Sequence, residues 1–99
     1  MALKRPISEA LRRAVAQRYG CEPGAYLKVR CAYCEHVGGI QWFMPQHRPG
    51  KGRVALESLE FDHSLAEACG GKSIAGNIVL ACRPCNRSKG AKPLTEWRT

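Results

Sequence analysis

Two cysteine pairs constrain this chain more than any other feature of its sequence. Cys31 and Cys34 form one C-x-x-C unit, Cys82 and Cys85 form another, and 47 residues lie between the units. Each spacing lets the backbone fold back so that both sulfurs reach one ion, and four thiolates complete the tetrahedral shell of zinc. Redox-active dithiols and unligated cysteines are the alternatives. The pairs predict a structural zinc that closes a long loop and so contributes to folding itself.

Length and charge narrow the class of protein. The length suits one domain, which we place at residues 1–99. No apolar segment is long enough for a signal sequence or a membrane span, so we expect a cytoplasmic protein with reduced cysteines and no membrane partner. An Arg-containing amphipathic beginning leaves an organellar targeting segment as the alternative. The formal net charge of +8 favours a polyanionic partner, which is nucleic acid or, alternatively, an acidic lipid surface.

Hydrophobic spacing predicts a small α+β domain. Residues 6–19 carry apolar side chains on one helical face, and this amphipathic helix is expected to be capped by Ser8 and ended by Gly20. A second helix is expected from Pro84, because proline suits the first helical turn. The other expected elements are an extended segment at 26–34, strands at 38–45, 54–62 and 78–81, and a last turn or helix at 94–97.

Polar residues lie between and after the cysteine pairs in a specific order: Asp62-His63 and then Gly76-Asn77 lie between the pairs, and Asn86 comes directly after the last cysteine. Each has an ordinary structural interpretation when taken alone, as strand-end polarity, a turn and a helix cap. Together, and within the frame of cysteine pairs, they resemble the HNH endonuclease family over residues 31–92. The chain departs from the family name at Asn86, which stands in place of the last His, as in H-N-N variants.

The resemblance implies a ββα-metal core of the His-Me finger, treble-clef-like type, preceded by the helix within residues 1–20. It also implies metal-dependent hydrolysis of DNA phosphodiester bonds, by nicking or double-strand cleavage, with His63 as general base. Asp62 and Asn86 are implied ligands of one catalytic ion, and their hard oxygen donors favour Mg²⁺ or Mn²⁺. Asn77 is implied to pin the loop between the strands and so orient the base.

Basic side chains near the second cysteine pair are candidate phosphate contacts. The candidates are Arg83, Arg87, Lys89 and, in the glycine-containing loop, Lys72. A solvated helix surface is the alternative for each of them. The resemblance is to small bacterial or phage proteins, some of which act beside phage packaging proteins, so DNA and such packaging proteins are the partners it implies.

Two other functions fit part of the pattern. A zinc-dependent nucleic-acid-binding module without catalysis would need neither Asp62 nor His63, and both are present. A zinc-stabilised protein-interaction domain would need neither the Asp-His pair nor the basic charge. Cys21 and Cys69 lack a nearby second cysteine and are expected to be ordinary thiols, and His36 is expected to be a bystander because four cysteines complete the zinc shell.

Overall fold

The computed structural model describes residues 7–46, 50–64, 70–92 and 97. The helices and strands, in chain order, are α1 (Glu9–Arg18), β1 (Tyr26–Arg30), β2 (Val37–Phe43), β3 (Arg53–Glu57), β4 (Glu60–His63), the 3-10 turn η2 (Ala75–Asn77), β5 (Ile78–Ala81) and α2 (Arg83–Lys89). The predicted α+β class is therefore confirmed. Cys69 and most of the turn expected at 94–97 lie outside the described residues.

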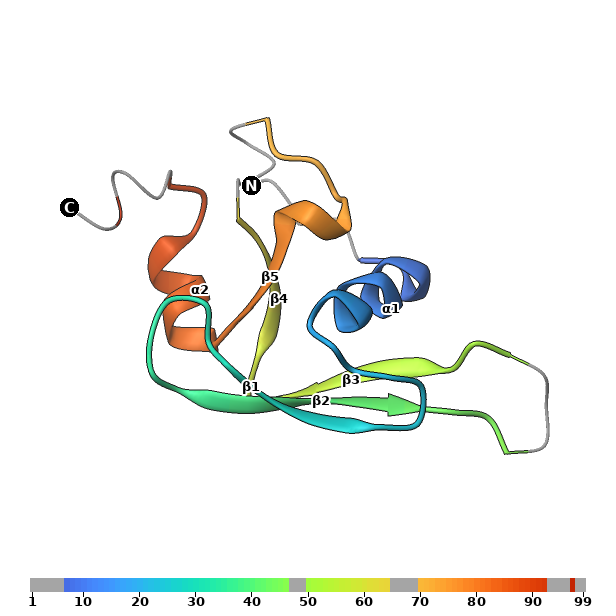
Figure 1. Ribbon diagram of the computed structural model, residues 1–99. Coiled ribbons are helices and arrows are strands. Elements are labelled where there is room, and N and C mark those ends of the chain that lie inside the picture. Colours follow the sequence, from blue (N-terminus) through green and yellow to red (C-terminus); the bar gives the residue numbers. More distant parts are fainter. Residues whose placement is uncertain (1–6, 47–49, 65–69, 93–96, 98–99) are drawn as a thin grey trace.

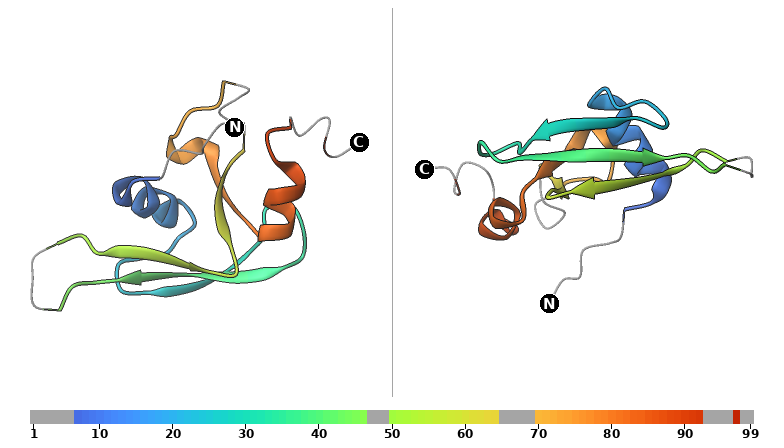
Figure 2. Two further views of the ribbon diagram at one scale, coloured as in Figure 1. Left: turned by 180° about the vertical axis from the view of Figure 1, so that it is seen from behind. Right: turned by 90° about the horizontal axis from the view of Figure 1, so that it is seen from below.

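The strands form two antiparallel sheets. One has the order β1-β2-β3, and the other contains only β4 and β5. The larger sheet turns Val29, Ile40, Trp42 and Val54 inward, where all four are buried. Figure 1 shows the β4–β5 pair standing across this sheet, with α1 on one side of the pair and α2 on the other. The view from behind in Figure 2 shows the same arrangement.

The strand expected at 54–62 is in fact two strands that belong to different sheets. Ser58 interrupts the run with a φ of 60°, and it is the one non-glycine residue of the described segments with positive φ. The chain there leaves the edge of the larger sheet and continues as β4. Gly38 on β2 makes room for this crossing, because a Cβ at that position would meet Glu57 and Leu59. The prediction of one continuous strand was wrong because the break depends on packing between sheets.

Helix α1 has the predicted N-terminal cap and is tied to the smaller sheet. The Ser8 hydroxyl accepts a hydrogen bond from the Leu11 N–H, which satisfies one of the free donors of the first turn. At the other end, Arg18 Nη1 donates to the carbonyl oxygens of Ala75 and Ile78. The Leu80 N–H donates to the Tyr19 hydroxyl at 3.0 Å. These contacts hold β5 against the N-terminal helix.

Helix α2 begins directly after β5 and lies against β4. Pro84 occupies its first turn, as predicted, and Gly90 ends it with a φ of 52°. The elements β4, β5 and α2 therefore form the ββα unit expected from the sequence. No helix among the described residues is long and apolar enough to cross a bilayer.

Candidate functional site

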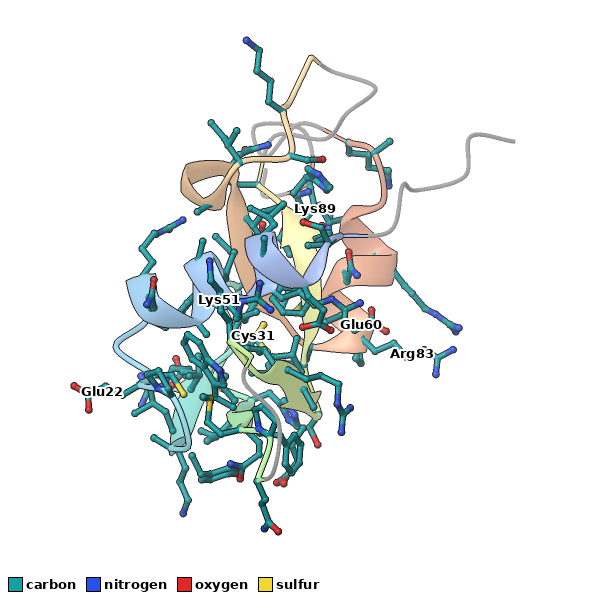
Figure 3. All side chains as sticks on the ribbon, turned by 90° about the vertical axis from the view of Figure 1, so that its right-hand side faces the viewer. Glu22, Cys31, Lys51, Glu60, Arg83 and Lys89 are labelled. Atoms are coloured by element: carbon teal, nitrogen blue, oxygen red, sulfur yellow. The ribbon has the colours of Figure 1, made fainter. Side chains whose placement is uncertain are left out.

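The four predicted cysteines converge on one point. The Sγ atoms of Cys31, Cys34, Cys82 and Cys85 all lie within 4.8 Å of one another, and those of Cys34 and Cys82 are 3.6 Å apart. A tetrahedral zinc with Zn–S bonds of about 2.3 Å separates its sulfurs by about 3.8 Å. The cluster, in which Figure 3 labels Cys31, therefore has the donor set and the spacing of a structural zinc site.

Backbone N–H groups and burial set the protonation of these thiols. Burial opposes ionisation of Cys31, but the N–H groups of Cys82 and Tyr33, which donate to its Sγ at 3.2 and 3.4 Å, lower its pKa to about 7. Burial raises the pKa of Cys82 and of Cys85 above the usual thiol value. A metal ion that binds here must therefore displace protons from these two thiols.

The remaining thiol and imidazole candidates lie outside this cluster. Cys21 is buried against the Ala25 carbonyl oxygen, and burial raises its pKa, as expected of an ordinary thiol. His36 is exposed and does not belong to the group of converging ligands found in the described residues.

Strand β4 carries both residues of the Asp-His pair at its end. It pairs with β5 in a register that sets Asp62 opposite Val79 and His63 opposite Ile78. Asp62 is 2 % exposed and His63 is 6 % exposed. His63 is the last residue of the strand, one position beyond the end expected from the sequence.

Two side chains from other elements bind the Asp62 carboxylate. The Tyr33 hydroxyl donates to Asp62 Oδ2 at 3.0 Å, and Lys89 Nζ lies 3.4 Å from the same oxygen. Tyr33 stands inside the first C-x-x-C unit, so one hydrogen bond joins the four-cysteine cluster to the Asp62 carboxylate. This role of Tyr33 was not predicted, although the position of a residue between the two cysteines is set by that unit.

The structure corrects the prediction that Lys89 contacts phosphate. Its side chain is completely buried, and Nζ donates to the His63 carbonyl oxygen at 2.9 Å as well as pairing with Asp62. Figure 3 shows Lys89 inside the fold, whereas Arg83 extends outward. Lys89 follows Asn86 by three residues, so both lie on the helical face that packs on β4. That spacing indicates the burial of Lys89 only once Asn86 is known to face β4.

The side chain of Asn86 contacts Glu60, the second carboxylate of β4. Its Nδ2 donates to Glu60 Oε1 at 2.8 Å. This contact turns the amide nitrogen of Asn86 toward the strand. Glu60 was not predicted as a site residue, although it precedes Asp62 by two positions and so projects from the same face of the strand.

A cavity of about 710 Å³ lies beside these residues. Its lining includes Glu60, His63, Asn86, Arg87 and, from helix α1, Arg12. The structure thus brings the predicted base and one predicted metal ligand to a common cavity with two guanidinium groups. Asp62 is not among the described residues that line it, because its carboxylate is turned toward Tyr33 and Lys89.

The loop before β5 contacts the imidazole of His63 and the side chain of Asn77. His63 Nε2 is 2.9 Å from Ser73 Oγ, so the loop and the ring share a hydrogen bond. Asn77 Nδ2 donates to the Lys72 carbonyl oxygen at 3.0 Å, and the Ser64 N–H donates to the Asn77 carbonyl oxygen at 2.7 Å. The side chain of Lys72 itself is exposed on this loop.

Comparison with known proteins agrees with this geometry. Searches of curated proteins and of solved structures gave no significant match. The sequence model of one family, described as HNH endonuclease, matches residues 31–92, which is more than half of the chain and includes both cysteine pairs, the Asp-His pair and Asn86. The ββα unit, the four-cysteine cluster and this match together show that the chain belongs to the HNH endonuclease family.

Proposed function

We propose that this protein is an endonuclease that hydrolyses DNA phosphodiester bonds with Mg²⁺ or Mn²⁺ as catalytic ion and zinc in the four-cysteine site. The observation that carries the proposal is the cavity shared by His63, Asn86 and two arginines in a chain of the HNH family. Membership of the family implies a metal-dependent nuclease. DNA as the substrate, Mg²⁺ or Mn²⁺ as the ion and the roles of the residues are the parts that we propose.

His63 is the general base in this proposal. Its imidazole lines the cavity and is oriented by Ser73, while its backbone is held by β5 and by Lys89. An imidazole can accept the proton of an attacking water at neutral pH when it is held in place. Asn77 supports it indirectly, because its hydrogen bonds connect the loop that carries Ser73 to the residue that follows the base.

Asp62 and Asn86 are the proposed ligands of the catalytic ion. The support for Asn86 is its place at the cavity with its Nδ2 turned to Glu60, and the support for Asp62 is the family resemblance and its position beside His63. In the described part of the chain both contacts of the Asp62 carboxylate use Oδ2, so we assign Oδ1 to the ion. A bound Mg²⁺ or Mn²⁺ would polarise the phosphate and stabilise the leaving oxygen.

Exposed cations around the cavity are the proposed phosphate contacts. Arg87 lines the cavity, and Arg83 and Lys72 are exposed. Arg12, which is partly buried, adds to the cavity a guanidinium that lies 5.3 Å from the centre of the Phe61 ring. Such side chains position the backbone of DNA without reading its sequence. A cytoplasmic location remains an expectation from the sequence, and phage packaging proteins remain an expectation from the resemblance.

Plasmid nicking tests this function. The purified zinc-loaded protein should relax supercoiled plasmid when Mg²⁺ or Mn²⁺ is added. His63→Ala should lose about 10²–10⁴-fold of the rate, which is the usual contribution of a positioned general base, and should keep its zinc and its DNA affinity. His36→Ala is the matched control, because it removes an exposed imidazole outside the cavity.

The alternatives give different results in the same assay. A binding module without catalysis would retard DNA in a gel but leave the plasmid intact with every divalent ion. Equal cleavage by the unchanged protein and by His63→Ala would refute the mechanism and point to another base or to a contaminating nuclease.

A further inference from the structure

We infer that Lys89 is a positioning residue of the active site, which holds the Asp-His pair at the end of β4 in the geometry needed for cleavage. The inference rests on the proposed function and adds a residue to it. Its starting point is a completely buried ammonium group that contacts two consecutive residues of the site.

The two contacts of Lys89 fix different parts of the strand end. Nζ pairs with the side chain of Asp62 at 3.4 Å and donates to the backbone carbonyl oxygen of His63 at 2.9 Å. The first contact restricts the carboxylate, together with the Tyr33 hydroxyl on the same oxygen. The second restricts the peptide that carries the imidazole. One ammonium therefore constrains the proposed metal ligand and the proposed base together.

Lys89 also sets how the helix and the strand lie relative to each other. Helix α2 carries Asn86, and the hydrogen bond from Asn86 to Glu60 is the first connection between this helix and β4. Lys89 makes the second connection one helical turn later, at the other end of the strand. The two proposed ligands of the catalytic ion come from these two elements, so their separation depends on both connections. A shift of about 1 Å in such a constellation can lower the rate about 10²-fold.

The expected effect differs from that of a phosphate contact. A buried ammonium that faces β4 does not reach the DNA backbone, so its loss should leave DNA affinity and its salt dependence unchanged. The turnover number should fall about 10²-fold while the KM for DNA stays the same. An exposed cation such as Arg87 should behave in the opposite way, with weaker binding and a salt slope lower by about one.

The experiment compares Lys89→Met with Lys89→Gln, which keeps an N–H donor for the His63 carbonyl oxygen. Lys28→Met is the matched control, because it removes one positive charge from an exposed site on β1. Zinc content and urea unfolding are measured first, and kinetics are then recorded well below the unfolding midpoint and per folded molecule. DNA affinity is measured against salt without added divalent ions, and the NMR signals of the His63 ring are compared among the variants.

The inference is supported if both Lys89 variants show a lower turnover number, unchanged KM and salt slope, and altered His63 ring signals, with less loss in Lys89→Gln. Normal turnover per folded molecule would mean that Lys89 serves stability alone and would overturn the inference, while the proposed function would stand. A raised KM with a lower salt slope would overturn it in favour of a phosphate contact. An unchanged protein that fails to cleave would refute the proposed function and, with it, this role.

Discussion

Replacing Lys89 by Met should lower the free energy of unfolding by about 3–5 kcal/mol, because it leaves the Asp62 carboxylate buried without its cation. The ammonium is fully buried and the carboxylate is 2 % exposed, so water cannot replace the lost partner without local opening. The His63 carbonyl oxygen loses its donor as well. This loss is contained in the range above, since the two contacts share one ammonium and are not additive.

A loss of this size is measurable without abolishing the fold. Domains of this length have total stabilities of about 5–15 kcal/mol, and zinc binding adds to that. Urea unfolding in the presence of zinc, followed by tryptophan fluorescence, reports the change because Trp42 is buried in the larger sheet. A shift of the thermal midpoint of about 4–8 °C for each kcal/mol provides a second measurement.

A double variant tests whether charge is the cause. Asp62→Asn combined with Lys89→Met keeps an acceptor for the Tyr33 hydroxyl but removes both charges. It should be more stable than either single variant, because each single variant leaves one buried charge unpaired. A loss below about 1 kcal/mol in Lys89→Met would contradict the reasoning, since that is the usual value of an ion pair in contact with water.

Zinc affinity should rise with pH, because the raised pKa of Cys82 and Cys85 keeps both thiols protonated at neutral pH and zinc must displace at least these two protons. The apparent Kd should therefore fall at least about a hundredfold per pH unit near neutrality in a competition assay with a chelator of known proton affinity, and a slope below two protons would refute this. Asn86→Ala should raise the Mg²⁺ or Mn²⁺ concentration needed for half-maximal cleavage and leave zinc content unchanged, whereas an unaltered metal dependence would rule out the ligand assignment. Arg87→Gln should weaken DNA binding and reduce the salt slope by about one, while Lys28→Gln should not, and equal slopes would place Arg87 away from DNA.

The features that the sequence predicts well are set by local chemistry. The C-x-x-C spacing is short, so it determines how two sulfurs meet an ion wherever the pairs lie in the fold. Ser8 and Pro84 mark the beginnings of the helices because capping and a fixed φ act within one turn. The end of the strand that carries Asp62 was predicted to within one residue, because β4 ends at His63.

The features that the sequence does not predict depend on contacts between distant residues. Ser58 breaks the expected strand because the chain must pass from one sheet to the other, which no local pattern encodes. Lys89 stands in a basic stretch and resembles its exposed neighbours until the helix is placed on β4. Arg18 contacts Ala75 and Ile78, which lie 57 and 60 residues further along the chain. Net charge therefore indicates the class of partner, but not which cations are able to reach it.

In the proposed mechanism, the hydrogen bond from Tyr33 to Asp62 would give the protein two separate sensitivities to chelators. A weak chelator would remove only a loosely held catalytic ion, and adding Mg²⁺ would restore cleavage at once. A thiol-competing chelator strong enough to strip zinc would release the loop from Cys31 to Cys34, and with it the hydroxyl that holds the carboxylate. Mg²⁺ alone would not then restore activity, and recovery would have to wait for zinc to rebuild the loop. A supply of zinc would thus determine whether the enzyme can respond to magnesium at all.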